Sequence, residues 1–182
     1  MGLSTWGGSL FFKMEESRKS KLGKQWARKA LTDYAGRVNQ GFAETSDTGQ
    51  FQKLASYDAI MLDFVPHGLE VAGIMEVKAR WFTDETLKQW GNEWFVSKSK
   101  LDRCAVVARH SRVPAYAMVV SVGLKEYWVM ELSNADGDIT IPHREAEVQT
   151  QKSTEGGQKT ELMAYINLDN AKRYKIERTN EQ

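Results

Sequence analysis

The sequence predicts an α/β fold in which a mixed central β-sheet is flanked by helices. Three observations lead to this class: a helical repeat of apolar residues opens the chain, two apolar runs separated by a turn follow, and helical and β-branched segments then alternate. With 182 residues, 41% of them hydrophobic, the chain has the size of one domain with its own core. We therefore expect residues 1–182 to form a single domain.

The first predicted helix runs from about Glu15 to Val38. Apolar residues recur at every fourth position and so share one side of it: Leu22, Trp26, Ala30, Tyr34 and Val38. Its first half is rich in Lys and Arg, including Lys24 and Arg28. Such a face is either simply solvated or contacts phosphate groups, and the sequence leaves both interpretations open. Residues 39–56 are polar and contain glycine, so we expect a loop there.

Two apolar runs in residues 57–81, Ala59 to Val65 and Leu69 to Val77, predict adjacent strands that are buried on both faces. Pro66-His67-Gly68 between them predicts a tight turn. If all three residues form the loop, Asp58 lies directly opposite Glu76, with Cβ atoms roughly 4.5–5.5 Å apart. With a two-residue loop, Asp58 lies opposite Val77 instead, and a twist or bulge is needed to bring the two carboxylates together.

Asp63 is the other acid in this hairpin. Under the two registers it pairs with Val71 or Ala72, which places it roughly 13 Å or more from Glu76. We therefore expect Asp58, not Asp63, to join Glu76.

Glu76 and Lys78 are two residues apart in a strand, so their side chains leave the same face. Two carboxylates and an ammonium are costly to gather in an apolar interior. A Mg²⁺ or Mn²⁺ ion, which prefers oxygen ligands and keeps several waters, would offset that cost. Lys78 would orient or help to deprotonate a metal-bound water, because burial among apolar groups lowers the pKa of a lysine.

The arrangement of Asp58, residues 59–75 and Glu76-Val77-Lys78 resembles the PD-(D/E)xK nuclease superfamily, in particular its junction resolvases and phage exonucleases. The resemblance implies a restriction-endonuclease-like core, metal-dependent hydrolysis of DNA, and metal ligands from Asp58, Glu76 and the Val77 backbone carbonyl. Tyr57 stands where the family has its loosely kept proline. The family's first helix often carries a further acid near the metal, and here only Glu16 or Gln25 could stand in for it, so a second metal is in doubt.

The middle of the chain predicts two more helices. Thr83-Asp84-Glu85 marks the start of a short helix that ends near Gly91 or Trp94, and we expect Trp90 and Trp94 to lie in the core. Trp81 is the better candidate for stacking on a base, because it lies close to the proposed metal. Ser97 is a candidate N-cap for the next helix, whose apolar face contains Leu101 and Cys104.

The last third of the chain predicts further strands. Ala115 to Val122 predicts a central strand that follows a helical crossover and therefore pairs in parallel. Tyr127 to Leu132 predicts the next strand, and residues 134–138 a turn. Residues 140–160 are polar and give no element, and Glu161 to Ile166 predicts a last strand.

Composition excludes several other classes of function. Cys104 is the single cysteine, which rules out an intrachain disulfide and favours a reducing compartment, such as the cytoplasm of a bacterial or phage-infected cell. One cysteine and three scattered histidines do not predict a zinc site. No signal peptide, membrane-spanning run, phosphate loop or serine-hydrolase motif is present.

The net charge is only +1, so a surface for a polyanion must come from local clusters of Lys and Arg. The residues expected to contact DNA are Lys24, Arg28, Arg80, Trp81, Lys98 and Lys100. The small size favours a structure- or end-directed endo- or exonuclease of recombination, repair or phage DNA processing. A homodimer is one expectation, because junction resolvases act as dimers. The alternative is a non-catalytic nucleic-acid-binding or assembly protein that retains the fold.

Overall fold

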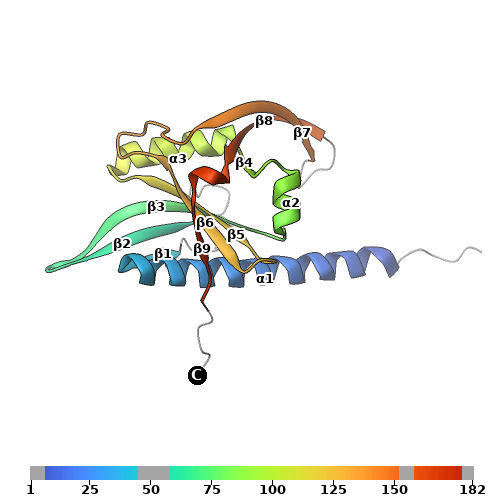
Figure 1. Ribbon diagram of the computed structural model, residues 1–182, viewed down its shortest axis with the longest axis horizontal. Helices are drawn as coiled ribbons and strands as arrows, with labels where there is room; N and C mark the ends of the chain where they lie inside the picture. Colours follow the sequence, from blue (N-terminus) through green and yellow to red (C-terminus); the bar gives the residue numbers. More distant parts are fainter. Residues whose placement is uncertain (1–6, 45–57, 152–157, 178–182) are drawn as a thin grey trace, which may run out of the picture.

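A six-stranded mixed sheet runs through the middle of the protein (Figure 1). The computed structural model describes the backbone of residues 7–44, 58–151 and 158–177, and the side chains of residues 21–44, 58–149 and 159–177. In spatial order the strands are β1 (Gln40–Glu44), β2 (Ala59–Val65), β3 (Gly68–Arg80), β5 (Ala115–Ser121), β6 (Glu126–Ser133) and β9 (Lys172–Lys175). β3 and β5 pair in parallel and the other neighbours are antiparallel, so the predicted fold class and the predicted parallel strand are confirmed.

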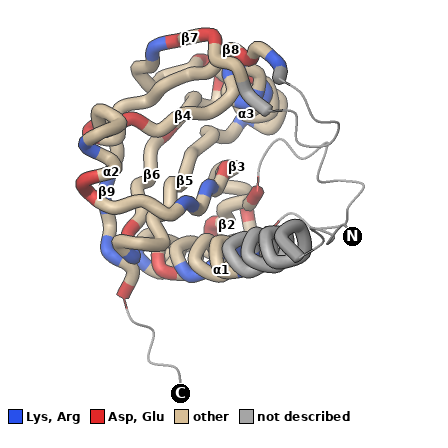
Figure 2. The backbone as a smooth tube through the Cα atoms, turned by 90° about the vertical axis from the view of Figure 1, so that its right-hand side faces the viewer, with Lys and Arg blue, Asp and Glu red and all other residues tan. Residues whose placement is uncertain are grey.

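A second sheet of three strands lies beside the first, in the order β4 (Glu93–Ser97), β8 (Gln158–Asn167) and β7 (His143–Gln151). It shares one side of the central sheet with α2 (Asp84–Gln89), α3 (Lys98–Ser111) and the short 3-10 helix η1 (Leu168–Asn170). The long helix α1 (Gly7–Val38) covers the other side (Figures 1 and 2). The central sheet is therefore the middle of three layers.

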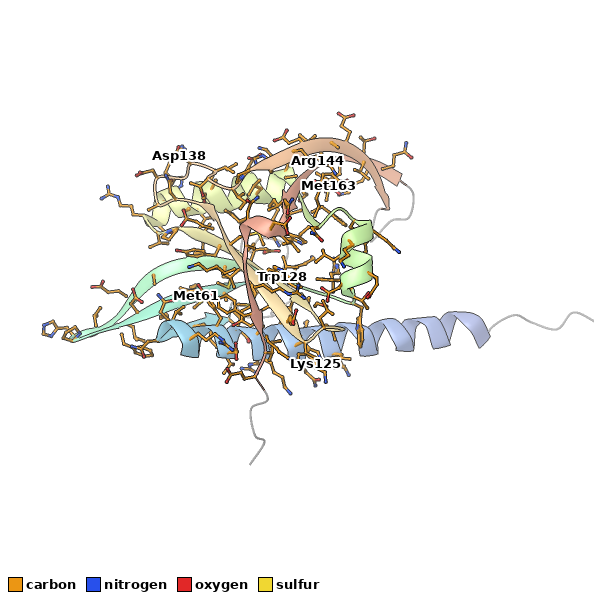
Figure 3. The ribbon with its side chains drawn as sticks, in the orientation of Figure 1. Met61, Lys125, Trp128, Asp138, Arg144 and Met163 are labelled. Carbon is orange, nitrogen blue, oxygen red and sulfur yellow. The ribbon has the colours of Figure 1, made fainter. Side chains whose placement is uncertain are left out.

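Helix α1 packs closely on the sheet because small residues form its contact face. Ala30, Leu31 and Ala35 are buried against Met61 of β2 and Met75 of β3 (Figure 3). Toward the start of this contact, a Cβ added at Gly23 would lie 3.7 Å from the Cβ of Ala79 on β3. Small side chains let helix and sheet approach without a cavity.

The opposite face of the central sheet packs against α3 and the second sheet. Ile74, Ala117 and Val119 meet Leu101 and Cys104 of α3 in one buried cluster. Leu101 is fully buried, and removing such a side chain from water contributes about 1.5–3 kcal/mol. Because residues alternate between faces, β3 sends Met75, Val77 and Ala79 toward α1 and sends the residues between them toward α3.

Several elements differ from the sequence-based prediction. The helix expected from Thr83 ends at Gln89, close to Gly91, the nearer of its two expected ends, and does not continue to Trp94. Gly91 and Asn92 then take φ values of 69° and 58°, which turn the chain into β4. The predicted start at Ser97 is confirmed as the residue before α3, although its side chain makes no capping hydrogen bond.

The sequence analysis missed four short strands, β1, β4, β7 and β9. β7 lies in the segment for which no element was expected, so that expectation is wrong. β1, β7 and β9 are edge strands of their sheets and their described residues are half-buried or exposed. Strands of this kind lack the apolar runs that mark buried ones. No helix in the described part of the chain is both long and apolar enough to cross a bilayer.

A polar network fixes the end of α1 to the sheet and to the last described residues. The buried Tyr127 hydroxyl donates to Asp33 Oδ2 at 2.6 Å, and Arg37 Nε donates to the same oxygen at 2.7 Å. The backbone N–H of Glu177 donates to Asp33 Oδ1 at 3.3 Å. These bonds lower the pKa of Asp33 against the opposing effect of burial. The Asp33 carboxylate thus joins helix, sheet and C-terminal segment.

Replacing Tyr127 with Phe removes one donor from this carboxylate. We expect Tyr127→Phe to lower the free energy of unfolding by about 1.5–3 kcal/mol, the range for hydrogen bonds to charged groups. Urea denaturation measures the difference. Tyr165→Phe is the matched control, because no hydrogen bond of its hydroxyl is found within the described residues, and equal stability of both variants would contradict the role of the network.

Candidate functional site

The β2–β3 hairpin sets the position of the candidate site. Its turn is Pro66-His67, because Val65 already pairs with Gly68. The turn thus has two residues, the second of the two lengths considered, but the pairing next to it matches neither expected register. A bulge between Met61 and Leu62 then shifts the register by one residue, and beyond it Ala59 pairs with Met75. Asp58 comes directly before this pair and lies beside Glu76, so the two acids are neighbours as expected, although by a different route.

A glycine permits the backbone to pass closely at this bulge. Gly73 pairs with Met61, and a Cβ there would lie 2.9 Å from Cε2 of Tyr116 and 3.2 Å from the carbonyl oxygen of Pro114. Both neighbours belong to the start of β5 or to the residue before it. The glycine therefore keeps β3 in contact with β5 while its pairing with β2 changes register.

Asp58 bonds to the backbone on both sides of Glu76. Its own N–H donates to the carbonyl oxygen of Met75 at 2.9 Å, and its Oδ2 accepts from the N–H of Val77 at 2.8 Å. These two bonds fix the Asp58 carboxylate beside the Glu76 side chain. The charge on Asp58 in turn raises the pKa of Glu76.

Glu76 is a buried carboxylate with an incomplete set of partners. Its side chain is 3% exposed, and Lys100 Nζ of α3 lies 2.5 Å from Oε1. Oε2 is buried and has no hydrogen-bond partner in the described part of the chain. Burial raises the pKa of Glu76 to about 7, the nearby Asp58 adds to this, and Lys100 opposes it. The lone oxygen is costly unless it meets a cation or a proton.

Lys78 leaves β3 on the same face as Glu76, two residues further on, and is half-buried. Burial lowers the pKa of its ammonium, and the neighbouring positive charge of Arg80 lowers it further. The carboxylates of Glu76 and Asp58 act in the opposite direction. A lysine in these surroundings gives up its proton more easily than one in water.

The donor set fits a hard divalent cation with few protein ligands. Asp58 and Glu76 would supply carboxylate oxygens. In a strand, the N–H and C=O of one residue point to the same side, so the Val77 carbonyl points toward Asp58, beyond the last pair of β2. No cluster of three or more His, Cys, Asp or Glu side chains suited to a metal is found among the described residues. Mg²⁺ suits such a sparse set because it retains several of its waters.

Asp63 is separate from this site. It pairs with Glu70. Both predicted partners, Val71 and Ala72, are therefore wrong, because the turn is Pro66-His67. Its Oδ1 accepts a 2.7 Å hydrogen bond from Nε2 of Gln40 on β1. The predicted separation of Asp63 from Glu76 nevertheless holds, because Asp63 lies between the bulge and the turn.

The residues predicted to contact DNA fall into two groups. Lys24 and Arg28 are exposed on α1, across the sheet from Glu76, and Arg28 Nε lies 3.2 Å from Glu44 Oε1. Gln25, considered as an additional ligand, is also exposed on α1, and the side chain of Glu16 lies outside the described residues. These residues can reach the candidate site only around the edge of the sheet.

The second group lies at or near the candidate site. Arg80 is exposed and donates to the carbonyl oxygen of Ala79 at 3.3 Å, and Trp81 is 56% exposed. Lys98 is held by Asp102 and lies 3.7 Å from Glu145. Lys100 points into the site, toward Glu76. Lys100 forms an ion pair with Glu76, one of the predicted catalytic residues.

Sequence analysis assigned Lys100 to phosphate binding and missed its direct pairing with Glu76. The spacing in α3 contained a usable pattern: Lys100 and Cys104 are four residues apart and so share one helix face. Cys104 is buried beside the site, and burial raises the pKa of its thiol to about 12, with Glu76 adding to the shift. A lysine on the same face as a buried cysteine points toward the sheet.

Comparison with known proteins gives little beyond this geometry. No family model matches the chain, and no curated protein matches it. A solved structure of a nuclease from a fusselovirus is similar at 10% sequence identity and a TM-score of 0.37, covering 94% of this chain and 89% of that chain. A likeness of that degree does not identify a family, so the function has to follow from the residues of this chain.

The raised pKa of Glu76 predicts how stability changes with pH in the absence of divalent cations. The unfolded carboxyl titrates near 4.5 and the folded one near 7, so the folded state holds the proton more tightly. The free energy of unfolding should therefore fall as pH rises from about 5 to about 8, by on the order of 3 kcal/mol.

Urea denaturation in EDTA measures this change. Glu76→Gln carries no titrating group at that position and should show a clearly smaller decrease over the same range. The account of Glu76 is contradicted if wild type and Glu76→Gln lose equal stability between the two pH values.

Proposed function

We propose that the protein is a metal-dependent phosphodiesterase that cuts DNA, with a site of the PD-(D/E)xK kind and a preference for particular DNA structures or ends. One observation carries the proposal: Asp58 is fixed beside a buried Glu76 whose Oε2 has no hydrogen-bond partner in the described part of the chain. Lys78 follows on the same face of the strand. Two carboxylates that can hold a divalent cation, and an amine with a lowered pKa beside them, are groups suited to the hydrolysis of a phosphodiester.

In this proposal Asp58, Glu76 and the Val77 carbonyl would hold Mg²⁺ or Mn²⁺. When bound, the ion would supply positive charge to the scissile phosphate and acidity to a water molecule. Lys78 would orient that water through a hydrogen bond, and its lowered pKa makes it a better proton acceptor than a lysine in water. Asp58 is held in place by the Val77 N–H and needs no rearrangement.

Lys100 of α3 neutralises Glu76 in this structure and would compete with a divalent cation for its Oε1. Beside a bound ion, Lys100 would be available to contact a phosphate oxygen, together with the exposed Arg80. Lys24 and Arg28 lie across the sheet, so they suit a duplex or strand that passes around its edge. Contacts of this type predict binding that weakens with salt.

The non-catalytic alternative has one observation in its favour. Lys100 already satisfies one oxygen of Glu76, so the acid can serve as part of a structural ion pair without any metal. A protein of that kind would bind nucleic acid through its basic residues and would not cut it. The two functions differ in what Mg²⁺ does to a DNA substrate.

The test of the proposed function is cleavage of plasmid, branched, nicked and linear DNA with and without Mg²⁺. Wild type should cut only with the ion. Lys78→Ala should lower the rate by about 10²–10⁴, the usual contribution of a group that transfers or positions a proton. Glu76→Ala and Asp58→Ala should abolish cutting because the ion is no longer held.

The matched control is Asp63→Ala, which removes a carboxylate of the same hairpin outside the site and should cut like wild type. Binding without cleavage by wild type in Mg²⁺ would favour the non-catalytic alternative. Loss of cleavage in Asp63→Ala with cleavage retained in Asp58→Ala would overturn the assignment of the metal ligands.

A further inference from the structure

A pocket of about 70 Å³ lies between the central sheet, α2, β4 and η1. It adjoins the face of β3 that carries Glu76 and Lys78. Its aromatic walls come from α2, β4 and their flanking residues, and Lys78 and Arg80 line the side toward β3. The residues that carry the argument are Lys78, Arg80, Phe82, Trp90, Trp94 and Phe95.

The pocket adjoins the candidate site directly, because Lys78 belongs to both. Glu76, Lys78 and Arg80 alternate with residues that face α1, so all three point to the side of α3 and the second sheet. At about 3.3 Å per residue, Arg80 is roughly 13 Å along the strand from Glu76. A ligand that reaches Glu76 with one end can therefore place another part in the pocket.

The aromatic side chains divide into a floor and a mouth. Phe82 and Trp94 are buried, whereas Trp90 is 47% exposed. Phe95 also lines the pocket, but its ring lies on the other face of β4 from Trp94 and packs on Tyr165, with ring centroids 5.9 Å apart. This exposure of Trp90 contradicts its predicted place in the core, because α2 ends at the residue before it. Trp90 packs obliquely on Phe82, with ring centroids 6.0 Å apart. Large aromatic side chains left open beside a pocket are suited to stacking on a flat ligand.

The charges beside these rings favour an anionic ligand. Lys78 and Arg80 line the pocket, and both belong to the strand that carries the candidate site. The one acid of the lining, Glu93, is already neutralised by Arg144, whose Nε donates to Glu93 Oε1 at 2.9 Å. An aromatic surface beside two cations suits a nucleotide, which combines a flat base with a phosphate.

We propose that this pocket receives one unpaired base of a nucleic-acid strand, next to the phosphate held at Asp58 and Glu76. The inference rests on the proposed function and makes it more specific: the substrate presents a single-stranded or unpaired nucleotide at the site. The small volume admits the edge of one base and excludes a base pair. The base stacks on Trp90, and its phosphate lies against Lys78 and Arg80.

The test is binding of a fluorescent oligothymidine single strand and of a duplex of the same length, in EDTA and at fixed low salt. The variant Trp90→Ala should bind the single strand about tenfold more weakly, because stacking on the base is lost, and should bind the duplex as wild type does. Trp90→Phe keeps an aromatic ring and should bind the single strand nearly as wild type does.

The matched control is Phe64→Ala, which removes an aromatic ring that is 65% exposed on the hairpin, away from the pocket. It should leave binding of both probes unchanged. The proposal is overturned if Trp90→Ala binds the single strand as tightly as wild type does, or if its duplex binding falls by the same factor. It is also overturned if Phe64→Ala weakens single-strand binding equally.

Binding in EDTA separates this proposal from the proposed function. If wild type cuts DNA in Mg²⁺ but Trp90→Ala binds single strands normally, the pocket assignment fails and the nuclease assignment stands. If wild type cuts nothing but single-strand binding depends on Trp90, the nuclease assignment fails and the pocket remains a base-binding site.

Discussion

The burial of one carboxylate beside another determines the organisation of the candidate site. Glu76 is 3% exposed and lies next to Asp58, so its charged form is opposed both by loss of water and by a like charge. Only part of this cost is offset inside the protein. Lys100 neutralises Oε1, and the Val77 N–H holds Asp58, but Oε2 has no hydrogen-bond partner in the described part of the chain. A divalent cation would satisfy the remaining oxygen.

The three layers of the fold contribute different parts of the site. The central sheet supplies Asp58, Glu76 and Lys78 from one hairpin. Helix α3 supplies Lys100, and the second sheet with α2 forms the aromatic pocket further along β3 (Figures 1 and 2). Helix α1 covers the other face, where small residues let it pack closely. Its basic residues are therefore separated from the acids by the thickness of the sheet.

The sequence predicted that Asp58 and Glu76 are neighbours, and this holds although the pairing next to the turn differs from the expected registers. The apolar runs fixed two adjacent strands, and side-chain alternation fixed the common face of Glu76 and Lys78. With a two-residue loop the sequence analysis required a twist or bulge, but the place of the bulge between Met61 and Leu62 could not be predicted, because Gly73 there passes close to Tyr116 and Pro114, which are distant in the sequence. The two-residue turn and the bulge together leave Asp58 beside Glu76.

Other parts of the structure were beyond prediction because they depend on tertiary contacts. The strand β4 follows two residues with positive φ, which ended a helix that the apolar spacing would have continued to Trp94. Lys100 looked like a surface residue at a helix start, yet α3 docks with that face against Glu76. The aromatic pocket joins residues from α2, β4 and β3, and no local pattern connects them.

The central claim is that Asp58 and Glu76 together hold a divalent cation, and calorimetric titration with Mn²⁺ tests it most directly. Wild type should bind the ion, Asp58→Asn and Glu76→Gln should lose binding, and Asp63→Asn should keep it. Lys100→Met, which removes the competing ammonium, should bind at least as tightly as wild type. Absence of binding in both wild type and Lys100→Met would contradict the account, and so would binding that Asp58→Asn and Glu76→Gln leave unchanged.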